Sequence, residues 1–266
     1  MSTLNGQLVN IISEMLSLSV TLPVLGITLP VLDIMHAILI TYTYRTGLRE
    51  NHAHIGWYQG FLATVVMASG GGSTVAILRG EPLGILKNNH FFGLYGLTYW
   101  LMFSNPYVYQ FFQFLFSVPL IEQLFTAADG IRRNHSIAVT GVEGVSLNPA
   151  LGADKWMAKI VCGAIAGCGG GLWVDAFRLT SQTWTFSTPR LLHTASIDMK
   201  ASLVASVFYV AVSHKEFCEW IGLPLFDAPS AQAWSAVILC SSMIYRTYAT
   251  KTKQPAETAE EEKKDQ

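Results

Sequence analysis

Long apolar runs separated by short polar segments make up most of this chain. The clearest runs hold about 20 residues, which is the length that an α-helix needs to cross a bilayer. The pattern predicts seven membrane-spanning helices, of which the third is the shortest. The expected helices are Leu22–Tyr44, Ile55–Leu78, Phe91–Phe103, Tyr107–Ala128, Trp156–Leu172, Leu192–Val212 and Ala231–Ala249.

Composition strengthens the case for an integral membrane protein. Hydrophobic residues make up 51% of the 266 residues and charged residues only 13%, whereas a soluble domain is about 25% charged. So few charges exclude an ordinary cytosolic enzyme. A net charge of −1 without a basic stretch argues against nucleic-acid binding. The four cysteines are scattered, which indicates neither a disulfide framework nor a metal site.

Two sequence patterns recur in the same order and indicate an internal repeat. In each copy a proline–acid segment comes before a triple glycine, and an arginine follows seven residues after the last glycine. The copies are Pro30–Asp33 with Gly70, Gly71, Gly72 and Arg79, and Pro119–Glu122 with Gly169, Gly170, Gly171 and Arg178. A unit of three helices fits this order. Because three is odd, the second copy must cross the membrane in the opposite direction, as in the inverted repeats of transport proteins.

The predicted architecture is therefore all-α, with a three-plus-three inverted repeat and an added seventh helix. The expected parts are a transmembrane channel domain at 1–250, repeat one at about 20–105, repeat two at about 107–213, the seventh helix at about 231–250 and a charged cytosolic tail at 251–266.

The end of the tail bears on orientation and location. Lys263 and Lys264 stand fourth and third from the last residue, and they resemble the dilysine retrieval signal of endoplasmic-reticulum membrane proteins, which is read in the cytosol. The alternative is a simple solvated end. With an odd number of spans, a cytosolic C-terminus places the N-terminus in the lumen. The first Lys or Arg is Arg45, so no secretory signal peptide is expected.

Charged residues inside the predicted spans are the main candidates for function, because a charge in hydrocarbon is costly and usually faces a pathway or a partner. For each residue alone, an internal ion pair or a snorkelling side chain is an equal alternative; as a set they favour a polar pathway. His36 lies three residues after Asp33 on one helix face, where a structural pair is the commoner arrangement. The candidates are Asp33, Glu122, Asp129, Asp175, Asp198 and Lys200, with Arg132 and Arg133 at a helix end.

The triple glycines have two interpretations. Small residues let helices approach closely, which explains one or two glycines. Three in succession also weaken a helix, by about 1 kcal/mol each, and a broken helix in mid-membrane is tolerated where it lines a cavity. We therefore expect both runs to break their helices beside a cation pathway.

These motifs, in this order, resemble those of the trimeric intracellular cation (TRIC) channels, and of an invertebrate-like member in particular. The resemblance runs from about Leu29 to Ile221. It rests on the segment from Leu29 through Asp33 to His36, Gly71-Gly72-Ser73 before Gly80-Glu81-Pro82, Gly167-Cys168-Gly169-Gly170-Gly171 before Phe177-Arg178-Leu179, and Lys200.

The resemblance implies a homotrimer with one pore in each subunit and no enzymatic activity. It implies potassium conduction across endoplasmic or sarcoplasmic reticulum membrane, as counter-ion flow during calcium release and uptake. It also implies that Asp33, Lys200 and the two glycine runs belong to the pore.

The family also binds phosphatidylinositol 4,5-bisphosphate, through a fourth-helix motif Lys-Glu-Val-x-Arg-x-x-Lys. Asp129 and Arg132 match the acid and the arginine, but Ala128 and His135 replace the lysines. Arg132 and Arg133 can still hold a phosphate bidentately. The sequon that begins at Asn134 is expected to be unused.

Three other functional classes compete with a channel. A secondary transporter shares inverted repeats and midplane charges. A membrane-embedded enzyme would need a catalytic set, and the sequence shows no metal-spaced cluster, Ser-His-Asp set or phosphate loop. A structural scaffold would not need buried charges.

Overall fold

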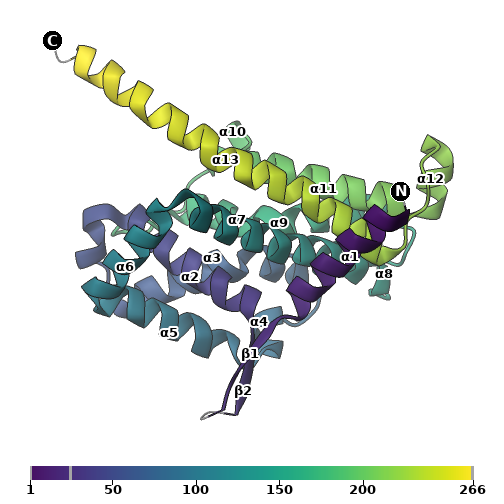
Figure 1. Ribbon diagram of the computed structural model, residues 1–266, viewed down its shortest axis with the longest axis horizontal. Helices are drawn as coiled ribbons and strands as arrows, with labels where there is room; N and C mark the ends of the chain where they lie inside the picture. The colour runs from purple at the N-terminus through teal and green to yellow at the C-terminus, as the bar shows by residue number, and fades with distance from the viewer. Residues whose placement is uncertain (1, 24–25, 265–266) are drawn as a thin grey trace.

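The computed structural model describes residues 2–23 and 26–264 and consists mostly of helices (Figure 1). The elements are α1 (Ser2–Ser17), β1 (Ser19–Leu22), β2 (Ile27–Pro30), α2 (Val31–Leu48), η1 (Arg49–Ala53), α3 (Trp57–Leu78), α4 (Gly84–Lys87), α5 (Phe91–Ser104), α6 (Pro106–Ser117), α7 (Pro119–His135), the π-helix η2 (Ser136–Glu143), α8 (Gly144–Leu147), α9 (Trp156–Phe177), α10 (Arg190–His193), α11 (Ile197–Ser213), α12 (Lys215–Ile221) and α13 (Ala228–Lys264).

In the part of the chain that the structure describes, two helices, α3 and α9, are long and apolar enough to cross a membrane, and the bent pair α6 and α7–α8 makes a third candidate. Both α3 and α9 have 22 residues and begin with tryptophan. They start 99 positions apart, at Trp57 and Trp156, which is the offset of the glycine runs. The structure therefore confirms a mainly helical, membrane-compatible fold, and the count of seven spans stays a prediction.

The expected helix breaks at the glycine runs are wrong, because α3 and α9 pass through them without interruption. The two helices cross there instead. A Cβ on Gly71 would lie 2.6 Å from the Ile165 carbonyl oxygen, and one on Gly170 would lie 2.3 Å from the Met67 carbonyl oxygen. At Gly71 and Gly170 any side chain would push the two backbones apart, whereas a Cβ on Gly72 would meet nothing within 4 Å.

The direction of α9 is opposite to that of α3. Met67 meets Gly170, and Gly71, further along α3, meets the earlier Ile165 of α9. Antiparallel packing of corresponding helices is what an inverted repeat requires, and the repeat boundaries themselves stay predictions.

The predicted helix at 107–128 is also wrong in its bounds. Helix α6 ends at Ser117, and a helical rod from Pro119 to Leu147 follows at 96° to it. The bend falls at Pro119, whose ring disfavours a helical conformation at the preceding Val118. Arg132 and Arg133 consequently lie near the middle of a continuous rod, not at a helix end.

The first predicted helix begins later than expected. Ser19–Leu22 and Ile27–Pro30 pair as antiparallel strands, and α2 starts only after Pro30. The apolar run from Leu22 contains Pro23 and Gly26, and Gly26 has φ 62°, so the chain turns there. The all-α prediction is thus wrong for this hairpin, and the 16-residue helix α1 before it was not predicted.

Helix α13 lies along α1, α7 and α11 and extends beyond the rest of the bundle (Figure 1). Its helix includes the predicted seventh span and continues to Lys264. The side chains of the predicted dilysine signal, and Asp265 and Gln266, lie outside the described part of the chain.

Candidate functional site

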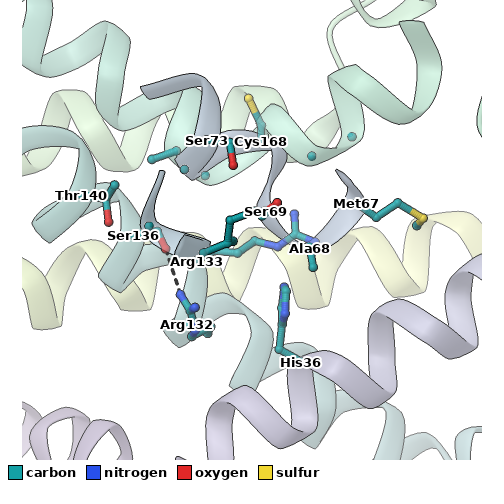
Figure 2. Close-up of a pocket in the computed structure, with 18 of the residues that line it drawn as sticks. His36, Met67, Ala68, Ser69, Ser73, Arg132, Arg133, Ser136, Thr140 and Cys168 are labelled. Carbon is teal, nitrogen blue, oxygen red and sulfur yellow. Dashed lines mark hydrogen bonds between the residues drawn. The ribbon is translucent and has the colours of Figure 1, made fainter. Parts of the chain in front are cut away.

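A cavity of about 1380 Å³ lies among the helices that carry the charged and glycine motifs. Its walls come from α2, α3, α7, η2 and α9, and α11 and α13 contribute at one side. Figure 2 draws some of the residues that line it. The charged and histidine side chains that line it are His36, Arg79, Glu81, Lys87, Glu122, Asp129, Arg132, Arg133, Asp198 and Arg246.

A network of ion pairs centred on Arg133 connects three helices across the cavity. The Arg133 guanidinium lies 2.9 Å from the Asp129 carboxylate on α7 and 3.2 Å from the Asp198 carboxylate on α11. Arg246 of α13 also pairs with Asp198. Asp129 is the most enclosed member, because its side chain is 1% exposed. This pairing stabilises charges that would otherwise be costly to bury.

A second ion pair joins α2 to the α7 rod. Arg132 Nε lies 2.5 Å from Asp33 Oδ1, and its Nη1 donates to Ser136 Oγ at 3.0 Å (Figure 2). Both arginines therefore face inward and hold partners. The snorkelling alternative placed both arginines at a helix end, whereas they lie within the rod from Pro119 to Leu147.

His36 pairs with residues that the sequence did not associate with it. Its Nδ1 is 2.5 Å from the Tyr95 hydroxyl, and its Nε2 is 3.6 Å from Asp129. The predicted His36–Asp33 pair is therefore wrong, since Asp33 faces Arg132. The ring points toward the Arg133 side chain in Figure 2.

Arg79 lines the cavity and links the end of α3 to η2. Its guanidinium donates to the Thr140 carbonyl of η2 at 2.5 Å and pairs with Glu81. Asn148 donates to Glu81 Oε1 at 3.1 Å. Burial raises the pKa of Glu81, but the hydrogen bonds from Asn148 and Arg79 outweigh it, so the net pKa is lowered. This cluster fixes the end of α3 to the π-helix, a helix type often found at functional sites.

Hydroxyl groups and glycines line the remaining walls. Ser69, Ser73, Ser136 and Thr140 face the cavity, so oxygen atoms are available along its length (Figure 2). Of the predicted glycines, Gly71, Gly72, Gly170 and Gly171 line it, while Gly70 and Gly169 contact the opposite helix at the crossing.

Lys200 is not brought to this cavity. It is exposed and lies in a separate shallow depression with Ser241 and Tyr245. Asp198, two residues earlier on α11, faces the cavity instead, as the different-face spacing predicts. Asp175 also lies away from the lining and pairs with Arg190 at 3.4 Å.

Sequence reasoning missed Tyr95 as the partner of His36 and the contact of Arg79 with η2. The repeat had pointed to Arg79, but its counterpart Arg178 is exposed. No sequence signal marks Tyr95, which lies in the shortest apolar run. The sequon falls on Asn134, which is buried and donates to the Gln232 carbonyl at 2.8 Å, in keeping with its expected lack of use.

Comparisons with known proteins agree with one another. A family model described as "TRIC channel" matches residues 55–224. A sequence search of curated proteins found no match. Among solved structures, a trimeric intracellular cation channel from C. elegans without Ca²⁺ is similar with TM-score 0.65 and 18% identity, over 91% of this chain and 96% of that one.

A structure of TRIC counter-ion channels, described for their activity in calcium release, is similar with TM-score 0.67 and 20% identity, over 83% of this chain and 93% of that one. A third structure, solved to explain conductance through TRIC cation channels, is similar with TM-score 0.57 and 19% identity, over 84% of this chain and 94% of that one. At these identities the structures show a common fold.

Proposed function

The chain belongs to the TRIC channel family, a family of ion channels and not of enzymes, and from that premise we propose that it conducts potassium across the endoplasmic or sarcoplasmic reticulum membrane. The flow would balance charge during calcium release and uptake. Each subunit of a homotrimer would hold one pore.

The observation that carries this proposal is the cavity at the crossing of the glycine runs. A monovalent cation needs oxygen ligands in place of water, and hydroxyls of α3 and η2 supply them beside the carboxylates of Asp129 and Asp198. Four carboxylates and five basic side chains line the described cavity, so the wall offers carboxylates without a large net charge. A movement that separates these ion pairs would expose the carboxylates to the ion.

Single-channel recording tests the proposal. Purified protein in a planar bilayer should give discrete currents in symmetric KCl, and a KCl gradient should shift the reversal potential toward that for potassium. Saturable slow flux of one small substrate without discrete currents would instead support a secondary transporter.

The homotrimer and the location are parts of the same proposal. The similar structures include channels described as trimeric, and mass measurement of the purified protein in detergent tests whether this chain forms a trimer. The proposed topology places the N-terminus in the lumen and the charged tail in the cytosol, and protease protection of tags at each end in sealed microsomes tests it.

We also propose that Arg132 and Arg133, with Asp129 beside them, form a site for the headgroup phosphates of phosphatidylinositol 4,5-bisphosphate. The support is that both guanidinium groups face a cavity large enough for a headgroup. A phosphate would have to replace Asp33 at Arg132, which is the more exposed arginine at 32%.

Lipid binding and open probability of Arg132→Gln and Arg132→Lys test this site. Loss of one charge-assisted contact, about 1.5–3 kcal/mol, should weaken binding roughly ten- to hundredfold. Lysine should restore charge but not the planar fork. Wild-type binding in the Gln variants of both arginines would remove them from the lipid site.

A further inference from the structure

An exposed apolar loop follows from the end of α12 toward α13. Its six residues, 220–225, read Trp-Ile-Gly-Leu-Pro-Leu, and all six are exposed. Trp220 is 79% exposed and Leu225 is 56% exposed. Loops that face water are usually rich in polar turn residues, whereas contiguous exposed apolar surface marks contact with a protein or a membrane. The composition of the apolar loop therefore favours a non-aqueous neighbour.

Backbone hydrogen bonds fix the apolar loop to the end of α11. Leu223 N donates to Cys218 O at 3.0 Å, and Phe226 N donates to Val212 O at 2.7 Å. Gly222 has φ 71°, so the chain turns back at the end of α12. In Figure 1, α12 projects beyond the end of α11. The loop is thus held outside the bundle by its own backbone.

Two tryptophans indicate where the membrane-spanning part of the bundle ends. The candidate spans α3 and α9 run in opposite directions, and each begins with an exposed tryptophan, Trp57 at 46% and Trp156 at 42%. A helix of 22 residues is about 33 Å long, close to the hydrocarbon thickness of about 30 Å. Tryptophan is enriched where lipid meets water. This pattern assigns Trp156 to one membrane–water boundary and Trp57 to the other.

Ring contacts place α12 at the same end of the bundle as Trp156. The Phe217 ring lies 6.0 Å from the Trp156 ring, and the Trp220 ring lies 5.7 Å from the Phe217 ring. Next to them, His214 Nε2 lies 3.3 Å from the carbonyl oxygen of Ala153, just before α9. The apolar loop therefore begins beside the end of a candidate span.

The sides of α12 differ in polarity. Lys215 and Glu219, four residues apart, lie on one side and pair at 3.9 Å. Phe217 and Ile221, also four residues apart, lie on the other side. A short helix with a charged side and an aromatic side suits the headgroup layer, where charges reach water and rings lie beside the upper acyl chains.

We propose that α12 and the apolar loop form a membrane-surface anchor that lies in the headgroup layer of the bilayer at the Trp156 end of the bundle. The ligand is the lipid surface itself. With one lysine and two glutamates, α12 has no excess positive charge to favour anionic lipid, so zwitterionic lipid is sufficient. The anchor holds the end of α11, whose opposite end carries Asp198 at the cavity.

Site-specific fluorescence in the full-length chain tests the proposal. An environment-sensitive fluorescent amino acid replaces Trp220 or, as the matched control on the charged side, Glu219, and the protein is placed in phosphatidylcholine vesicles. At position 220, a nitroxide near the lipid headgroup should quench the emission more than one near the chain end, and iodide in the water should lose most of its effect. At position 219, iodide should quench more strongly than at position 220.

Two results would overturn the anchor. Equal iodide quenching at both positions, without quenching by lipid nitroxides, would mean that the apolar loop faces water. Protection of position 220 from iodide and from both nitroxides would mean that protein covers it.

A pair of double variants tests the apolar side chains, with the fluorescent residue now at Leu223. Trp220→Ser with Leu225→Ser should lose the headgroup-nitroxide quenching and gain iodide quenching, whereas Trp220→Phe with Leu225→Ile should keep the wild-type pattern. Because the side chains of Trp220 and Leu225 are exposed, both double variants should keep the wild-type melting temperature in detergent. An unchanged quenching pattern in the serine variant overturns the anchor. None of these measurements depends on potassium current or on a trimer, so their failure leaves the proposed function standing.

Discussion

Replacing Arg133 with glutamine should destabilise the protein strongly, because it removes the cation shared by two carboxylates. Arg133 contacts Asp129 at 2.9 Å and Asp198 at 3.2 Å. Asp198 keeps its pair with Arg246 after the change. Asp129 keeps only the His36 ring at 3.6 Å among the described ion-pair partners, so its carboxylate remains buried without a strong counter-charge.

The expected magnitude follows from that burial. Removing one partner of a buried ion pair costs about 3–5 kcal/mol. A change of 1 kcal/mol shifts the melting temperature of a chain of this size by roughly 2–4 °C. Arg133→Gln should therefore lower the melting temperature by roughly 6–20 °C. Arg132→Gln is the matched comparison: its partner Asp33 is 20% exposed, against 1% for Asp129, so water can partly solvate the carboxylate that loses its cation and the melting temperature should fall less.

Heating the purified variants in detergent and measuring the remaining folded protein by gel filtration gives these temperatures. Adding Asp129→Asn to Arg133→Gln should recover most of the loss, since the unpaired charge is then gone. The buried network does not stabilise the fold as argued if Arg133→Gln and Arg132→Gln have the same melting temperature. The same conclusion follows if the double variant is no more stable than Arg133→Gln alone.

Three further outcomes are expected. Gly71→Ala should destabilise the fold by about 1–3 kcal/mol and reduce current, because its Cβ would lie 2.6 Å from a backbone oxygen of α9. The control Gly72→Ala should be tolerated, because its Cβ would meet nothing within 4 Å. Equal melting temperatures of the two variants would contradict the packing role. Glu81→Gln should lower the melting temperature at pH 7. The difference in melting temperature from the wild type should vanish as the pH falls through the lowered pKa of Glu81, because a carboxyl group with a depressed pKa stabilises the fold only while it is ionised. A difference that persists at low pH would argue against this. Lys263→Ala with Lys264→Ala should move protein to the cell surface in surface biotinylation, and unchanged retention would mean that another signal holds it.

The sequence by itself determined the membrane class and the two central helices. Predicted bounds of 55–78 and 156–172 compare with Trp57–Leu78 and Trp156–Phe177, because a long apolar run favours a spanning helix through local burial and backbone hydrogen bonding alone. The ordered motifs also identified the family.

Only the tertiary structure decided what the glycines and charges do. A glycine run weakens an isolated helix, but two such runs that meet let α3 and α9 approach closely, and that packing keeps both helices continuous. In the same way, Arg133 is separated from Asp198 by 65 positions and His36 from Tyr95 by 59. Such partners depend on helix rotation and depth, which arise from packing between helices and leave no pattern in the local sequence.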